Sequence, residues 1–342
     1  MRKLLNTLYV TRENSYLSLD GENLVLSEER KELLRLPFTN IESIVCINYL
    51  GCSPALMGKC AEKSIGLCFI SPSGRFLARV TGKIKGNVFL RKMQLELLNN
   101  ENTKVKLIQD LIDCKIKNTK TLLQRSKRDH AKIDDGGEIS HCLEILENNR
   151  ANLFLTKDID VLRGIEGQSA KSYFYVFDKL FIKQRDDFKL NGRNKKPPTD
   201  NTNAILSFLY TVCTNDIASA LECVGLDPYI GFYHTLRSGR VSLACDIMEE
   251  FRCVIERLVI SLVNLKVITN SDFTKQISGA VLLNDEGRKK VLSAWQTKKK
   301  EIIIHPFLKE KIPLGLFAYV QSNLLAKYIR GEIEQYPNLI VK

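Results

Sequence analysis

Apolar and polar residues alternate in two different ways along this chain. From residue 1 to about 80, short runs of β-favouring residues are separated by turn signals such as Asp20-Gly21 and Ser53-Pro54. Strands are therefore predicted at 9–10, 16–19, 23–26, 41–46, 66–70 and 76–80. One helix is predicted at 54–63, because Ser53 can cap it and proline is favoured in a first turn. This part should form a small, mostly-β domain.

Beyond residue 82 the apolar residues recur three and four positions apart, which is the spacing of helices. Helices are predicted at 88–99, 102–126, 139–149, 153–162, 164–181, 202–224, 242–269 and 311–330. Two basic segments, 184–199 and 288–300, are predicted to be irregular. The expected fold class is α+β with two domains. A mostly-β domain at 1–82 and a linker at 83–88 precede a larger, all-α catalytic domain at 89–342.

The charge balance indicates the kind of partner. The 342 residues include 51 Lys and Arg against 39 Asp and Glu, which gives a formal net charge of +12. Such a surplus favours a polyanion, most often nucleic acid. No apolar leader precedes Arg12, and no stretch reaches about 18 uncharged apolar residues, so a cytoplasmic protein without a membrane partner is expected. The ten cysteines form no CxxC pair and are expected to be small core residues.

One histidine and three acids suggest a metal site. His234 ends the run Gly231-Phe232-Tyr233-His234, and a predicted helix beginning near Ser242 carries Asp246, Glu249 and Glu250. A neutral imidazole with carboxylates is a ligand set for a divalent metal. Asp246 can pair with either glutamate, because residues three or four apart share a helix face. Glu250 flanks the apolar stripe and Glu249 points nearly opposite it, so the spacing does not choose, and all three acids could instead form a solvated face.

Further charged residues are candidates for the same site. Glu166 is predicted to lie in the first turn of an apolar helix between Gly164 and Gly167, where a backbone or a phosphate could approach closely. An acid in a first turn could equally serve only its own helix. The candidates for contacts to DNA phosphates are basic residues after His234 and in the segment 184–199, namely Arg237, Arg240, Arg193, Lys195 and Lys196.

Taken together, these segments resemble the CRISPR-associated integrase family, the nuclease subunit that captures new spacers. The resemblance rests on Gly-Ile-Glu-Gly at 164–167, Ile-Gly-Phe-Tyr-His at 230–234 and Ser-Leu-Ala-Cys-Asp-Ile-Met-Glu-Glu-Phe-Arg at 242–252. The segments 193–200 and 203–210 also look like the family, apart from a local departure at 199–201, and the segment 325–333 is similar to type I-C members.

The resemblance implies a specific site and reaction. The metal ligands and catalytic residues would be Glu166, His234 and Glu249, with Asp246 as a supporting acid and Mg²⁺ or Mn²⁺ as the cofactor. A DNA 3′-hydroxyl would attack a phosphodiester at the CRISPR repeat boundary. The partners implied are double-stranded DNA, a second copy paired through the β domains, and a small ferredoxin-like companion subunit.

Three other functions are compatible with the residues alone. They are a metal-dependent nuclease acting on branched DNA in repair, a DNA-binding scaffold without catalysis, and a metal hydrolase acting on a small molecule. The last of these leaves the basic charge unexplained.

Overall fold

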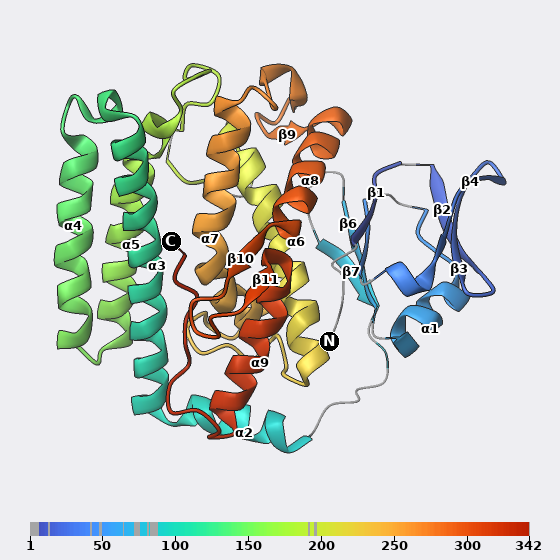
Figure 1. The fold of residues 1–342 in the computed structure, drawn as a ribbon, viewed down its shortest axis with the longest axis horizontal. Helices are drawn as coiled ribbons and strands as arrows, with labels where there is room; N and C mark the ends of the chain where they lie inside the picture. Colours follow the sequence, from blue (N-terminus) through green and yellow to red (C-terminus); the bar gives the residue numbers. More distant parts are fainter. Residues whose placement is uncertain are drawn as a thin grey trace.

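A strand-rich domain lies beside a larger helical domain in the computed structural model (Figure 1). The structure describes residues 7–12, 14–41, 43–47, 50–63, 65–71, 76–80, 82, 88–190, 192–194 and 197–341. It confirms the α+β fold class with a strand-rich first part and a helical second part. Residues 83–87 of the predicted linker lie outside the described residues.

The N-terminal domain contains two sheets and one helix. The first sheet has the order β1 (Thr7–Val10), β5 (Ser43–Cys46), β6 (Gly66–Ile70), β7 (Phe76–Val80), with only β7 antiparallel to its neighbour. The second is an antiparallel meander of β2 (Ser15–Asp20), β3 (Asn23–Glu28) and β4 (Lys31–Pro37). Helix α1 (Pro54–Lys63) packs against β2 and β6, and Ser53 Oγ accepts from Leu56 N at 3.2 Å, so the predicted cap is present.

Strand β4 was absent from the sequence prediction. All its side chains except the half-buried Leu36 are exposed, so it lacks the in–out alternation by which strands are recognised. Its pairing with β3 specifies it instead, which is typical of an edge strand.

The helical domain is built around two long buried helices. Helix α6 (Asn201–Val224) packs on α7 (Ser242–Asn264) and on α9 (Phe317–Ile329). Helix α3 (Glu101–Asp129) also packs on α7, and α4 (Glu138–Asn152) pairs with α5 (Ile159–Val176) at the outer edge in Figure 1. Helix α2 (Val88–Asn99) lies against α3 and α9. Helix α6 has the length and composition of a membrane span, but 67% of its most apolar window is buried inside the protein, as in a core helix.

The prediction of two helices at 153–162 and 164–181 was wrong. Residues Leu153–Leu155 form a short 3₁₀ helix, and α5 runs without a break from Ile159. The Asp158 side chain caps it by accepting from Asp160 N at 2.8 Å. Gly164 does not break α5, since an isolated glycine weakens a helix without ending it. Glu166 therefore lies seven residues after the helix begins, and not in its first turn.

The segment 288–300 was also predicted wrongly. It belongs to helix α8 (Asp285–Lys300). The side chain of Asn284 caps the start of this helix by accepting a hydrogen bond from Gly287 N at 2.9 Å. Val291, Leu292 and Trp295 are buried at helical spacing among the lysines that suggested a loop. The segment 184–199 is irregular in its described residues, as predicted.

The domain expected to be all-α carries strands as well. Two antiparallel pairs, β8 (Phe273–Lys275) with β9 (Val281–Leu283) and β10 (Ile302–Ile304) with β11 (Lys311–Pro313), lie between α7 and α9. Strand β11 occupies the first residues of the range predicted for the last helix, so α9 begins only at Phe317, and α7 ends at Asn264, inside its predicted range. Three-residue strands are too short for a periodic pattern to reveal them.

Polar contacts join the two domains. Arg79 of β7 reaches Glu222 of α6 at 3.2 Å. Lys299 of α8 lies 3.2 Å from Asp216 of α6, within the helical domain. The same ammonium donates to Thr7 Oγ1 at 3.0 Å.

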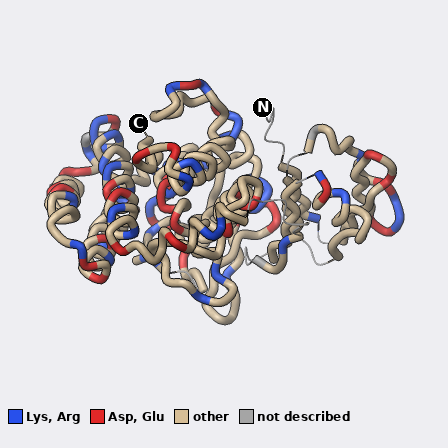
Figure 2. The backbone as a smooth tube through the Cα atoms, turned by 90° about the horizontal axis from the view of Figure 1, so that it is seen from below, with Lys and Arg blue, Asp and Glu red and all other residues tan. Residues whose placement is uncertain are grey.

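Lys and Arg are spread over both domains with acids between them (Figure 2). Eight of the ten cysteines are buried, leaving only Cys223 exposed and Cys245 half-buried, which confirms the prediction that most are core residues.

Candidate active site

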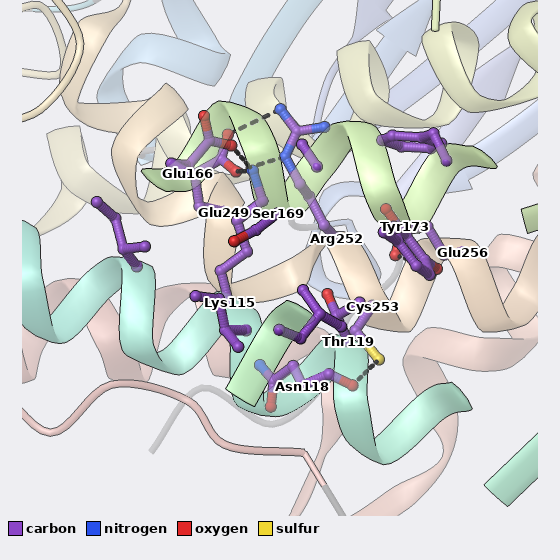
Figure 3. Close-up of a pocket in the computed structure, with 15 residues that line it drawn as sticks. Lys115, Asn118, Thr119, Glu166, Ser169, Tyr173, Glu249, Arg252, Cys253 and Glu256 are labelled. Carbon is purple, nitrogen blue, oxygen red and sulfur yellow. Dashed lines mark hydrogen bonds and ion pairs between the residues drawn. The ribbon is translucent and has the colours of Figure 1, made fainter. Parts of the chain in front are cut away.

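Two of the three predicted ligands, Glu166 and Glu249, meet at one lysine. Glu166 comes from α5, Glu249 from α7, and Lys115 reaches them from α3 (Figure 3). Lys115 Nζ forms an ion pair with Glu166 Oε1 and lies 2.7 Å from Glu249 Oε2. Two carboxylates from different helices therefore converge on a single cationic position.

Arg252 holds Glu249 from the other side. Its Nε donates to Glu249 Oε2 at 2.6 Å and its Nη2 donates to Glu249 Oε1 at 2.7 Å, which makes the contact bidentate. The guanidinium lies over the Tyr210 ring, 4.6 Å from its centroid, and Tyr210 donates to Glu256 at 2.7 Å. Burial alone would raise the pKa of Glu249, but Arg252 and Lys115 outweigh it and hold that pKa well below its usual range. Glu249 is therefore an ionised carboxylate in a fixed orientation.

Asp246 orients the predicted histidine ligand. It is completely buried, and its Oδ1 accepts from His234 N at 2.8 Å and lies 2.6 Å from His234 Nδ1. Its Oδ2 accepts from Phe232 N at 2.7 Å and from Tyr233 N at 3.1 Å. In a neutral imidazole, a carboxylate at this distance places the ring proton on Nδ1 and the lone pair on Nε2. This is the carboxylate–histidine arrangement found behind metal ligands.

Gly231 allows the histidine loop to pack directly on the start of α7. A Cβ at this glycine would lie 2.6 Å from Asp246 Oδ2 and 2.7 Å from the carbonyl carbon of Ser242. By contrast, a Cβ at Gly164 or Gly167 would meet nothing within 4 Å, so the described residues do not make the close approach expected beside Glu166. The backbone of α5 at these two glycines therefore has open space beside it.

The side chains of the three predicted ligands, Glu166, His234 and Glu249, do not converge on one point in this structure. Tyr233 Oη donates to Glu166 Oε2 at 3.4 Å, which links the histidine loop to the carboxylate pair. Within the described ranges, however, no three His, Cys, Asp or Glu side chains are close enough to hold a metal ion. The donor types, two carboxylates and an imidazole with a free Nε2, fit Mg²⁺ or Mn²⁺. The position between the carboxylates is taken by the Lys115 ammonium.

Glu250 has a different environment from Glu249, although they are neighbours. It is completely buried and accepts hydrogen bonds from Tyr336 Oη, Leu339 N and Gln321 Nε2, each at 2.7 Å. These donors belong to α9 and to the segment after it. Glu250 thus attaches the C-terminal segment to α7 and does not face Glu166.

The environment of Glu250 makes stability depend on pH. Burial raises the pKa of Glu250 from its ordinary value of 4.5 to about 7, against the hydrogen bonds that lower it. The folded protein therefore keeps this proton more tightly than the unfolded chain. The contribution to stability is complete below pH 4.5 and is lost as the pH rises toward 7, by about 3 kcal/mol. Melting temperatures between pH 5 and 8 should show this decrease in the wild type and not in Glu250→Gln. The same slope in both proteins would contradict it.

A basic groove lies beside Glu166. Its volume is about 880 Å³, and its lining includes Lys115, Glu166 and Arg252. Its remaining charged lining is mostly basic and comes from α5 and the segment after it: Lys171, Asp178, Lys179, Arg185, Asp186, Lys189 and Arg193. The groove has the charge and position to hold a phosphate backbone next to the acids.

The predicted DNA-contacting residues are placed differently from one another. Arg193 lines the groove, but its guanidinium also donates to Asn194 O at 2.8 Å and lies over the Tyr210 ring. Arg237 is exposed and Arg240 is half-buried, in the loop between His234 and α7. Lys195 and Lys196 lie outside the described residues.

Sequence reasoning missed Lys115 and Arg252. Arg252 follows Glu249 by three positions, so a helical ion pair was a recognisable signal. Lys115 offers no such signal, because its partners lie 51 and 134 positions further along the chain and only packing brings them together.

A comparison with known proteins identifies the family. The family model described as "CRISPR associated protein Cas1" matches residues 8–297. This chain belongs to the Cas1 family. The family predicted from the motifs is confirmed.

Relatives in the Cas1 family match along the whole chain. A CRISPR-associated endonuclease Cas1 of Chlorobaculum tepidum is 42% identical over 341 residues, which cover 99% of both chains. One of Rhodospirillum rubrum is 44% identical over 345 residues, which cover 98% of both. A third, of Moorella thermoacetica, is 39% identical over 337 residues and again covers 98% of both chains.

Solved structures show that the fold is shared more widely. A casposase bound to an integration product superposes with a TM-score of 0.84 at 18% identity, over 97% of this chain and 92% of that one. A Cas1 protein from Thermotoga maritima superposes with a TM-score of 0.82 at 20% identity, over 98% of this chain and 99% of that one.

Proposed function

We propose that this protein is a metal-dependent DNA endonuclease and integrase that inserts new spacers into a CRISPR array. In the reaction, a DNA 3′-hydroxyl attacks a phosphodiester at the repeat boundary, and one phosphodiester replaces another. The observation that carries the proposal is the convergence of Glu166 and Glu249 on the Lys115 ammonium, beside a basic groove that Glu166 and Lys115 line. Further support comes from full-length relatives that are named endonucleases.

The side chains of the site would have different roles in the reaction. Glu166, His234 and Glu249 would hold Mg²⁺ or Mn²⁺, which supplies positive charge against the charge that builds on the phosphate. Asp246 keeps the imidazole turned with Nε2 free, and Arg252 keeps the Glu249 carboxylate ionised and in place. The basic side chains of the groove would contact the DNA backbone, so DNA affinity should fall steeply with salt.

The proposed partners follow from the family. The DNA substrates are a double-stranded spacer precursor and the CRISPR repeat, and the system is of type I-C. A second copy would pair through the β domain at 1–82, and a small ferredoxin-like companion subunit would join two such pairs in the cytoplasm. Complexes that contain Cas1 and Cas2 chains are among the structures with a similar fold.

A branched DNA that mimics a half-integrated spacer tests the reaction. We expect the purified protein to resolve it into a joined strand with Mn²⁺ and not with EDTA, and His234→Ala to lose this activity. His141→Ala is the matched control, because His141 is exposed on α4. Cleavage of branched DNA without preference for a repeat end would indicate a repair nuclease instead. DNA binding without strand transfer, unchanged by metal, would indicate a scaffold.

A further inference from the structure

Lys115 is an unusual neighbour for two proposed metal ligands. Its side chain is 18% exposed, and its ammonium contacts both Glu166 and Glu249. It reaches them from α3, whereas the carboxylates come from α5 and α7. The lysine thus lies where the two carboxylates point, which is also the position that suits a shared divalent ion.

The ammonium and a divalent ion cannot both occupy this position. Lys115 Nζ lies 2.7 Å from Glu249 Oε2, and Mg²⁺ binds carboxylate oxygen at about 2.1 Å. An ion shared by both carboxylates would therefore overlap the ammonium. Two positive charges at such a short separation repel strongly in a site with little water. Arg252 remains as the positive partner of Glu249 if the lysine leaves.

The structure also provides a place for the displaced side chain. Lys115 lines the groove of about 880 Å³ together with Glu166, Lys171 and Lys189. A lysine stem is long and flexible, and its ammonium is a compact charge that readily binds phosphate oxygens. Turned into the groove, Lys115 would lie beside a DNA phosphate.

We propose that Lys115 is an internal counter-cation that exchanges with the divalent ion. Without the ion it holds Glu166 and Glu249 together and prevents their mutual repulsion. When the ion binds, Lys115 leaves the carboxylate pair and turns into the groove, where it becomes a phosphate-binding side chain. Ion binding and DNA binding are thereby coupled through one residue. The inference rests on the metal site of the proposed function.

The exchange can be observed directly in the unmodified protein. Amine labelling followed by mass spectrometry measures how accessible each lysine is, and Lys171 on the same groove serves as an internal reference. We expect labelling of Lys115 to be low in EDTA and to increase several-fold with Mn²⁺, while that of Lys171 stays constant. Labelling of Lys115 that Mn²⁺ leaves unchanged would overturn the proposal.

A variant provides the second measurement. Lys115→Gln removes the competing charge, so calorimetry without DNA should find Mn²⁺ bound about tenfold more tightly than in the wild type. Lys171→Gln removes a lysine of the same groove and should leave the affinity near the wild-type value. Equal or weaker Mn²⁺ binding by Lys115→Gln, or no Mn²⁺ binding by either protein, would overturn the exchange. A melting curve in EDTA checks that the variant is folded.

Different results would contradict the integrase function and the lysine exchange. Metal-dependent strand transfer with unchanged labelling of Lys115 would keep the integrase function and discard the exchange. Increased labelling of Lys115 with Mn²⁺ but no strand transfer would keep the exchange and discard the integrase.

Discussion

Replacing Glu249 with glutamine should reduce strand transfer by about a thousandfold while the protein remains folded. The carboxylate of Glu249 contacts both Arg252 and Lys115, and glutamine keeps its volume and one acceptor oxygen but not its charge. The site would then lose half of the negative charge with which its two glutamates attract the metal ion. The measurement is the single-turnover rate on branched DNA with Mn²⁺, together with the melting temperature.

Glu147→Gln is the matched control for this change. Glu147 also pairs with a lysine and an arginine, but on the exposed side of α4, and its loss should leave the rate unchanged. If Glu249→Gln were active, the result would assign the role of metal ligand to Asp246 or Glu250 instead. Both of those are already committed to other hydrogen bonds, so that result would also require a rearranged α7.

Asp246→Ala should lose both activity and stability. It removes an acceptor for three backbone N–H groups and the His234 ring, all at a position without solvent exposure. We expect the free energy of unfolding to fall by about 3–5 kcal/mol, because the donors remain buried without partners. Strand transfer should fall at least about a hundredfold, because the imidazole is no longer oriented.

Asp227→Ala is the comparison for the aspartate. Asp227 lies in the same loop and accepts one backbone hydrogen bond, from Tyr229 N at 2.8 Å. Its loss should lower the free energy of unfolding by about 1 kcal/mol. Melting temperatures and rates of the two variants separate loop anchoring in general from the specific role of Asp246. Similar losses in both would show that Asp246 only anchors the loop.

The success of the sequence predictions depended on how local the signal was. Helices α1, α2 and α6 were found almost to the residue, because a cap or an apolar repeat marks each of them within the chain itself. The helix α8 was missed because its lysines obscured a buried stripe, and α5 was divided because its glycines suggested a break that the helix does not make. The short strands of the helical domain depend on pairing with distant residues, which no local pattern records.

The amino-acid sequence by itself determined the two-part organisation, the basic charge and the motifs that place the chain in its family. It also placed Asp246, Glu249 and Glu250 on one helix, because the helical period follows from spacing alone. Only the tertiary structure decided what each acid does: Asp246 holds the histidine loop, Glu249 faces Glu166, and Glu250 binds the C-terminal segment. The period sets the direction of a side chain about its own helix axis. What that side chain meets depends on the surrounding helices, and these include α3 with Lys115, 134 positions away from Glu249.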